Sequence, residues 1–216
     1  MPEARILAVR TGRIIPLGPD RVPSAIAKHA RDGAVKVGPL GLDGDQQGDL
    51  SVHGGEEKAV YGYAAAHFTA WSRAFPDLAG QFVSGAMGEN LTVAGLQESG
   101  ICPGDVHAIG SALLQVCQPR RPCFKFALHL GSNRVIKAMV QTGHSGWYYR
   151  VLQPGSLSAG DAITLVERPN PDFSFTRLVQ IVSFGRPTRA ELERMADMEG
   201  LASQWRRKAR MVLGRP

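Results

Sequence analysis

Glycine separates this chain into many short segments, and this pattern limits the folds open to it. Of its 216 residues 25 are glycine, and several of them bound stretches in which apolar and polar residues alternate. Alternation over a few residues between glycine turns is typical of short β-strands. We expect strands at residues 4–9, 12–15, 34–38, 106–110, 112–117, 146–152 and 162–166, and at the end of 85–93. Many short strands with few helices predict a mainly β fold of the α+β class, a β-barrel with helical insertions.

Helices are expected in four parts of the chain, one of which is a short segment after Cys123 that ends at Gly131. In residues 59–75 aromatic residues recur at steps of three or four before Pro76, which predicts a helix packed in the core. Residues 132–142 predict another helix, with Ser132 as its cap and Gly143 beyond its end. The prolines of 169–171 mark a boundary, and Thr188 and Glu191 form a capping-box pattern beyond it. The sequence therefore predicts a barrel domain in residues 1–168 and a small three-helix domain in residues 171–216.

One cysteine, Cys123, stands in an unusual setting. It follows Pro122 directly, and Arg120, Arg121 and Lys125 lie within three residues of it. Pro119 and Pro122 stiffen the approach, because proline fixes its own φ and restricts the residue before it. Nearby positive charge favours the thiolate, which is the form that attacks electrophiles or binds soft metals. A buried structural cysteine among solvated cations is the competing interpretation.

The distribution of charge supports an anion-binding role. The net charge is +6, and no acidic residue occurs between Asp105 and Asp161, although six basic residues do. Such a block produces a positive field suited to a phosphate, an anionic cofactor or a nucleic acid. An evenly solvated basic face is the alternative, but opposite charges normally intersperse on a plain surface.

Residues 38–58 are rich in glycine and acid, and they predict a loop that approaches a ligand closely. His53 precedes Gly54 and Gly55, where backbone amides can face outward. A histidine satisfied by the backbone of a turn is an equally simple reading of this segment.

Several classes of protein are excluded. No apolar run is long enough to span a membrane, and the N-terminal residues lack the apolar core of a signal peptide, so a cytoplasmic location is expected. Cys102, Cys117 and Cys123 contain no C-x-x-C spacing, which argues against a disulfide framework, an iron–sulfur cluster and a four-cysteine zinc site. Cys117 ends an apolar strand and is expected in the core.

Read together, the motifs resemble the MOSC family, and specifically its YiiM-type members. The resemblance covers about residues 5–167, and the tail resembles the three-helix domain of that subfamily. The matching motifs are SAI-x-K at 24–28, VGPLGLDGD at 37–45, D-x-x-x-HGG-x-x-KAV at 49–60, GENLTV-x-GL at 88–96, GD-x-x-x-IG at 104–110, QPR-x-PC-x-K at 118–125 and GWY-x-RVL at 146–152.

This resemblance implies a molybdenum cofactor (molybdopterin) with Cys123 as thiolate ligand to the metal and as the catalytic residue. It also implies that N-hydroxylated compounds, such as N-hydroxylated purine bases, are reduced there. Basic and glycine-rich segments would hold the pterin and its phosphate. The implied cofactor-binding residues are Ser24, Lys28, His53, Gly54, Gly55, Lys58, Arg120 and Lys125, with Glu89 and Asn90 nearby in a less defined role.

The implied partners are a small N-hydroxylated substrate and a separate electron donor. The chain carries no G-x-G-x-x-G, no Walker A motif and no cluster-like cysteine pattern, so electrons are expected from a flavin or iron–sulfur protein. The basic segment 206–210 is either its docking site or a solvated face. A homodimer is plausible by resemblance. A sulfur carrier with a Cys123 persulfide and a nucleic-acid-binding module stay open as alternatives, although no nucleic-acid recognition motif is present.

Overall fold

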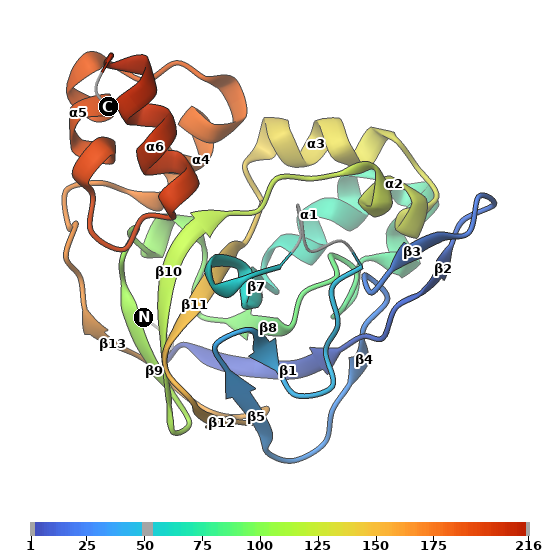
Figure 1. The fold of residues 1–216 in the computed structure, drawn as a ribbon. Helices are drawn as coiled ribbons and strands as arrows, with labels where there is room; N and C mark the ends of the chain where they lie inside the picture. Colours follow the sequence, from blue (N-terminus) through green and yellow to red (C-terminus); the bar gives the residue numbers. More distant parts are fainter. Residues whose placement is uncertain (1–2, 49–53, 215–216) are drawn as a thin grey trace.

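An eight-stranded sheet forms the centre of the protein in a computed structural model that describes residues 3–48 and 54–214 (Figure 1). The strand order is β13-β9-β10-β11-β7-β8-β1-β4. Only β7 and β8 pair in parallel among the described ladders. The strands are β1 (Arg5–Thr11), β4 (His29–Ala30), β7 (Val60–Ala64), β8 (Leu91–Ala94), β9 (Val106–Ile109), β10 (Ala112–Pro119), β11 (Trp147–Gln153) and β13 (Ile163–Glu167).

Smaller ladders complete the β part of the fold. The strands β12 (Gly155–Leu157), β5 (Val35–Gly38) and β6 (Gly41–Leu42) form a three-stranded sheet, and β2 (Ile15–Leu17) pairs with β3 (Val22–Ser24) in a projecting hairpin (Figure 1). The start of β1 approaches the segment before β13, because Ile6 N donates to Asp161 O at 2.9 Å and Ile163 N donates to Ala4 O at 2.8 Å. These bonds bring two parts of the sheet together, but the described ladders do not form a closed ring. The mixed α+β class is confirmed, and the barrel stays a prediction.

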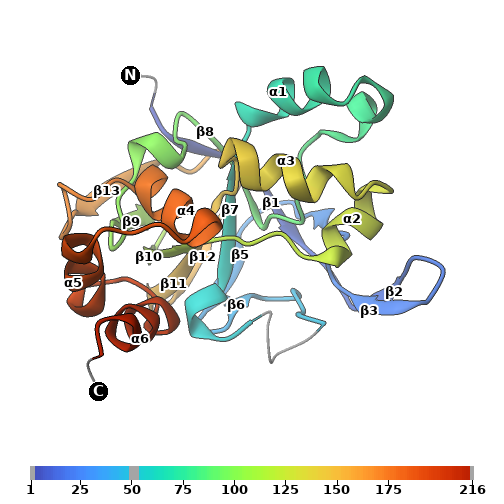
Figure 2. The same ribbon diagram turned by 90° about the horizontal axis from the view of Figure 1, so that it is seen from above.

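Helices cover the sheet in two groups (Figure 2). The first group consists of α1 (His67–Ala74), α2 (Phe124–Leu130) and α3 (Arg134–Thr142), and the second of α4 (Phe175–Phe184), α5 (Arg189–Asp197) and α6 (Ser203–Val212). Three short 3-10 helices, η1 (Glu56–Lys58), η2 (Pro76–Gln81) and η3 (Glu98–Gly100), join the larger elements. In the described part of the chain no helix is long and apolar enough to cross a membrane.

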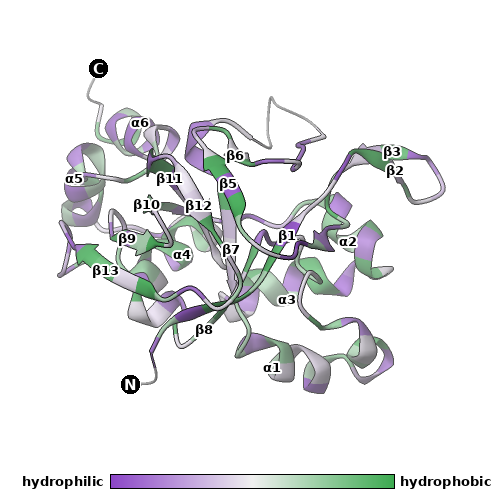
Figure 3. Cartoon of the chain, turned by 90° about the horizontal axis from the view of Figure 1, so that it is seen from below, coloured by the Kyte–Doolittle hydropathy of each residue, from purple (hydrophilic) through white to green (hydrophobic). Residues whose placement is uncertain are grey.

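The C-terminal helices match the local signals of the sequence. Thr188 and Glu191 form a complete capping box at the start of α5. Figure 3 shows hydrophilic stretches along α5 and α6, while Trp205 and Ala209 of α6 are buried. Residues of α4, α5 and α6 belong to the same apolar core as the central sheet. A separate domain in residues 171–216 stays a prediction.

Three local predictions were wrong. The strand expected at residues 12–15 is absent, because β1 ends at Thr11 and β2 begins only at Ile15. Residues 59–75 are not one helix: β7 occupies Val60–Ala64 and α1 begins only at His67. All five residues of β7 are buried, so this strand lacks the alternation that exposes a half-buried strand in a sequence. Ser132 does not cap α3, since Asn133 is the N-cap residue and its side chain makes no capping hydrogen bond. The expected Gly143 does end α3, in a left-handed conformation with φ of 71°.

Candidate functional site

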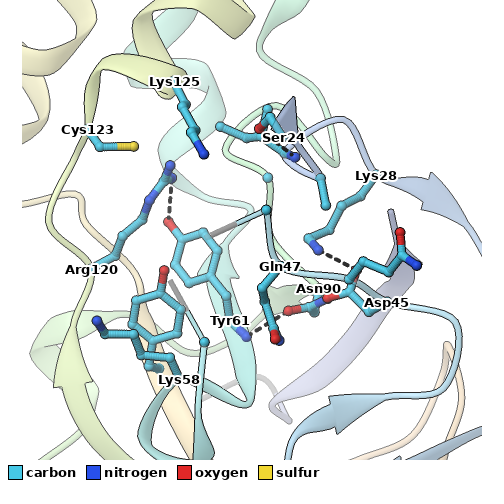
Figure 4. Close-up of a pocket in the computed structure, with 17 residues that line it drawn as sticks. Ser24, Lys28, Asp45, Gln47, Lys58, Tyr61, Asn90, Arg120, Cys123 and Lys125 are labelled. Atoms are coloured by element: carbon cyan, nitrogen blue, oxygen red, sulfur yellow. Dashed lines mark hydrogen bonds and ion pairs between the residues drawn. The ribbon is translucent and has the colours of Figure 1, made fainter. Parts of the chain in front are cut away.

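A cavity of about 650 Å³ of empty space, open to solvent, lies where five distant parts of the chain meet. Figure 4 shows Arg120, Cys123 and Lys125 on one side and Lys28 and Asp45 on the other. The lining residues are Ser24, Ala25, Ile26, Lys28, Asp45, Gln46, Gln47, Gly48, Gly54, Lys58, Tyr61, Gly88, Asn90, Arg120, Cys123, Lys125 and Tyr148. The sheet supplies Tyr61 and Tyr148, and loops supply most of the charged groups.

Cys123 is the one cysteine of the three that is not buried. It lies between the end of β10 and the start of α2, in an extended conformation with φ of −126° and ψ of 170°. Pro119 is the last residue of β10 and pairs with Trp147, so the segment leaves the sheet from a fixed point. The extended segment that the prolines predicted before Cys123 therefore continues directly from β10.

The other two cysteines are unsuited to reaction with solutes. Burial raises the pKa of the Cys117 thiol to about 12, and its Sγ donates to the carbonyl oxygen of Glu57 at 3.0 Å. Burial also raises the pKa of Cys102. The expected core position of Cys117 is confirmed, since its exposed fraction is 0%.

Arg120 and Lys125 are held by neutral oxygen atoms rather than by carboxylates. Arg120 Nη1 donates to Met87 O at 2.5 Å and to the Tyr61 hydroxyl at 3.3 Å, and Lys125 Nζ donates to Pro23 O at 2.9 Å. Their exposed fractions are only 7% and 8%. Because a carbonyl oxygen does not neutralise a cation, both side chains keep a positive charge available to an anion in the cavity.

The opposite wall is a connected polar network. Lys28 Nζ lies 2.5 Å from Asp45 Oδ1, which also accepts from Gly12 N at 2.7 Å. Asn90 Nδ2 donates to Asp45 Oδ2 at 2.8 Å, and Asn90 Oδ1 accepts from Tyr61 N at 3.0 Å. Burial lowers the pKa of Lys28, while Asp45 opposes that shift. This network connects β7 with the loop after β1 and with the loops that carry Lys28, Asp45 and Asn90.

Tyrosine hydroxyls and a further lysine complete the wall. Burial raises the pKa values of Tyr61 and Tyr148 against the opposing effect of Arg120, so both phenols keep their protons at neutral pH. Tyr61 Oη donates to Ser145 O at 2.8 Å. Burial lowers the pKa of Lys58. Among the described lining residues there are four cations and one carboxylate, a surplus of three positive charges.

This cation-lined cavity with a thiol at its edge lies in a recognisable sequence family. Residues 49–164, more than half of the chain, match the family model described as "MOSC domain". The chain belongs to the MOSC family. "Protein YiiM" of Escherichia coli (strain K12) is 39% identical over 199 residues, which are 92% of this chain and 88% of that protein.

Solved MOSC structures have the same overall fold. A crystal structure of YiiM from Geobacillus stearothermophilus aligns with a TM-score of 0.81 at 33% identity, covering 97% of this chain and 99% of that chain. YiiM from Escherichia coli aligns with a TM-score of 0.77 at 31% identity, covering 95% and 94%. A protein of Gibberella moniliformis named "Reductase" is 37% identical over 180 residues, and this chain spans 32% of its length.

The structure brings most of the predicted site residues to this cavity. Those that line it are Ser24, Lys28, Gly54, Lys58, Asn90, Arg120, Cys123 and Lys125. Gly55 is not among the lining residues, and His53 lies outside the described residues. Glu89 is not among them either. It is fully buried and accepts from Gly85 N at 2.6 Å and Met87 N at 3.1 Å, which makes it the support of the loop that carries Gly88.

Sequence reasoning missed several residues of this wall. Asp45, Gln47, Tyr61 and Tyr148 line the cavity without having been expected there. Asp45 ends the matched VGPLGLDGD segment, and Tyr148 lies inside GWY-x-RVL, so both were within reach of the motifs. Tyr61 was predicted to lie on the apolar face of a helix, and this error concealed its position in the cavity wall. Across the described residues no group of three or more His, Cys, Asp or Glu side chains could hold a metal ion by itself.

Proposed function

We propose that this protein uses a molybdenum cofactor to reduce N-hydroxylated compounds, with N-hydroxylated purine bases as one substrate class. The observation that carries the proposal is the half-buried thiol of Cys123 at the edge of a cavity with a surplus of positive charge, in a chain of the MOSC family. The name "Reductase" of one relative agrees with a reductive activity.

The residues of the cavity fit such a cofactor. A cysteine thiolate is a soft ligand for a metal whose remaining ligands come from the cofactor itself, so no cluster of several protein ligands is needed. Among the described residues no carboxylate pairs with Arg120 or Lys125, and these two cations suit the phosphate of a pterin cofactor. Lys28, Lys58, Ser24 and Gly54 supply further polar groups to the cavity lining. When bound, the group supplies a metal centre that can exchange two electrons.

The chain itself contributes position, charge and protons. Cys123 would hold the metal, and the cations would hold the anionic part of the cofactor. The reaction R–NH–OH + 2 e⁻ + 2 H⁺ → R–NH₂ + H₂O breaks the N–O bond and consumes two protons. The Tyr148 hydroxyl keeps its proton at neutral pH and lies on the cavity wall, so it can donate a hydrogen bond to the substrate oxygen. The electrons come from a separate flavin or iron–sulfur protein.

The proposal extends to the organisation of the chain. It takes residues 1–168 as a MOSC-type barrel and residues 171–216 as a small helical domain. It also places the protein in the cytoplasm, because three cysteines without a disulfide framework suit a reducing compartment.

Replacing Cys123 with serine tests the ligand assignment. The variant and the control Cys102→Ser are expressed in a host that makes the molybdenum cofactor, and their metal content and reduction of an N-hydroxylated purine are measured. We expect Cys123→Ser to lose metal and at least a hundredfold of activity, since the thiolate ligand is gone, and Cys102→Ser to retain both. Full metal and undiminished activity in Cys123→Ser would sink the assignment. Thermal unfolding checks that both variants are folded.

The same half-buried thiol also suits a sulfur carrier, which is the second candidate. A persulfide on Cys123 would add about 32 Da to the isolated protein, the mass of one sulfur atom on a reactive thiol. Mass spectrometry that finds this adduct in metal-free protein would favour the carrier over the reductase.

A further inference from the structure

We propose that the exposed basic face of α6 is the docking site for the electron donor, an acidic flavin or iron–sulfur protein. This inference rests on the proposed function, because it names the surface at which the electrons needed for N–O reduction are delivered. In each turnover the partner's centre is oxidised by two electrons, and the substrate receives them together with two protons from solvent.

The charge of α6 is uniform and largely uncompensated. Its ten residues include Arg206, Arg207, Lys208 and Arg210 and contain no acid. Among the described residues, a salt bridge engages Arg210, with Asp197, and none engages the other three. The inward side of the helix is occupied by Trp205 and Ala209, with exposed fractions of 6% and 1%. Arg207 and Lys208 are exposed, whereas Arg206 and Arg210 are only partly exposed and the Nε of Arg206 is buried. A face of this kind attracts an acidic protein and raises its rate of association.

The end of α6 adds an apolar contact area to this charge. Met211 and Val212 have exposed fractions of 71% and 58%. Arginine and methionine are enriched in protein–protein interfaces, in which an apolar centre is surrounded by polar groups. Charge and composition together therefore point to a protein partner rather than to a small anion, which would need a cavity.

The first turn of α6 is bonded to the end of β10, the strand that precedes Arg120 and Cys123 of the cavity lining. Ala202 N donates to Cys117 O at 2.9 Å, and Gln204 and Trp205 both donate to the side chain of Gln118. Gln118 lies in β10, two residues before Arg120, and the segment that carries Cys123 follows this strand. Figure 1 shows α6 beside the end of β10 from which that segment departs.

A second connection runs through Glu57, the neighbour of Lys58. The Glu57 carboxylate accepts from Ser203 N at 2.8 Å and from Ser203 Oγ at 2.9 Å, and it pairs with Arg150 at 2.9 Å. Gln118 Nε2 donates to Glu57 O at 2.8 Å. A partner bound to α6 is thus placed next to two segments that line the cavity, which is the position an electron donor needs.

The test uses an acidic flavodoxin as the probe donor and reduced methyl viologen as a small donor. Arg207→Glu/Lys208→Glu changes the net charge by −4 on the proposed face. Arg73→Glu/Lys137→Glu is the matched control, with the same charge change at exposed positions of α1 and α3, which lie away from α6 in Figure 2. Flavodoxin binding is measured by calorimetry, and turnover of an N-hydroxylated purine by the holoprotein is measured with each donor.

We expect the α6 variant to lose about tenfold or more in flavodoxin affinity and in flavodoxin-supported kcat/KM at low salt. Its rate with viologen should be unchanged, and the control should behave like the wild type. The effect should shrink as salt screens the charges. Equal loss in both variants, no loss in the α6 variant, or failure of flavodoxin to bind would overturn the inference. Tight binding of a single-stranded oligonucleotide to α6 would also overturn the inference, if the substitutions left flavodoxin-supported turnover unchanged. Absence of turnover with viologen would instead refute the proposed function, because that donor does not need the docking face.

Discussion

The buried pair of Lys28 and Asp45 is expected to be essential for the stability of the cavity wall. In Asp45→Asn the ammonium group of Lys28 loses its counter-ion but keeps its burial, since the exposed fractions of the two side chains are 8% and 3%. Removing one partner of a buried ion pair typically costs about 3–5 kcal/mol of unfolding free energy. The amide nitrogen introduced by the substitution would also face the donating Nδ2 of Asn90, which now lies 2.8 Å from Asp45 Oδ2.

The loss should depend on pH with a definite sign. Burial already lowers the pKa of Lys28 from its ordinary value of 10.5, and the loss of Asp45 removes the main opposing influence. In the variant the folded protein therefore binds fewer protons than the unfolded chain at any pH between the lowered pKa and 10.5. Stability then rises with pH across this window, by about 1.4 kcal/mol for each unit of depression.

Urea unfolding at pH 7 and pH 9.5, followed by the fluorescence of the three tryptophans, measures both effects. Lys28→Met and the double variant Lys28→Met/Asp45→Asn complete a double-mutant cycle. We expect the double variant to be more stable than Asp45→Asn, because it leaves no unpaired charge in the interior. The exposed pair of Arg189 and Glu193 supplies the control, since Glu193→Gln should cost less than about 0.5 kcal/mol. A loss below 1 kcal/mol in Asp45→Asn, or a coupling energy near zero, would refute this reasoning.

Two further predictions concern groups whose environments differ sharply. Iodoacetamide at pH 8 should modify Cys123 first and leave Cys117 unmodified, because burial raises the pKa of Cys117 to about 12; peptide mass spectrometry that finds Cys117 labelled as fast as Cys123 would contradict this. Burial disfavours the charge of Glu98, but His67, 2.6 Å away, holds its pKa below the ordinary 4.5. Glu98→Gln should therefore cost about 2–3 kcal/mol at pH 7. The difference in unfolding free energy between Glu98→Gln and the wild type should become smaller as pH falls below 4.5, because the wild type then loses the contribution of an ionised Glu98. Urea unfolding measures this difference. A difference that stays constant down to pH 3 would contradict the prediction.

Local signals explain why much of the secondary structure was predictable. Strand alternation is visible where one face is buried and the other exposed, as in β5, whose residues alternate between buried and exposed positions. Capping is equally local, and the box of Thr188 and Glu191 involves residues only three positions apart. The pairs of glycine and aspartate at 104–105 and 160–161 precede β9 and β13, which turn out to be neighbours in the sheet. These features depend on contacts between residues close in sequence.

Some residues of the candidate site were likewise predictable from their sequence neighbours, and others were not. The setting of Cys123 is local, since its prolines and cations are sequence neighbours, and the sequence was enough to single it out. The role of Glu89 was not readable, because the amides that it accepts belong to a loop whose path is set by packing. Tyr61 was hidden in the same way, since a strand buried on both faces has no distinctive period.

By itself, then, the sequence indicated the strands with one exposed face, the capping box of α5 and the cysteine that stands among cations. Only the tertiary structure decided which groups neutralise one another. Asp45 pairs with Lys28 across 17 residues, and Glu57 binds Ser203 across 146 residues, whereas Arg120 and Lys125 are left with carbonyl oxygens. Such pairings follow from how the sheet brings loops together, and the burial that makes them strong exists only in the folded protein.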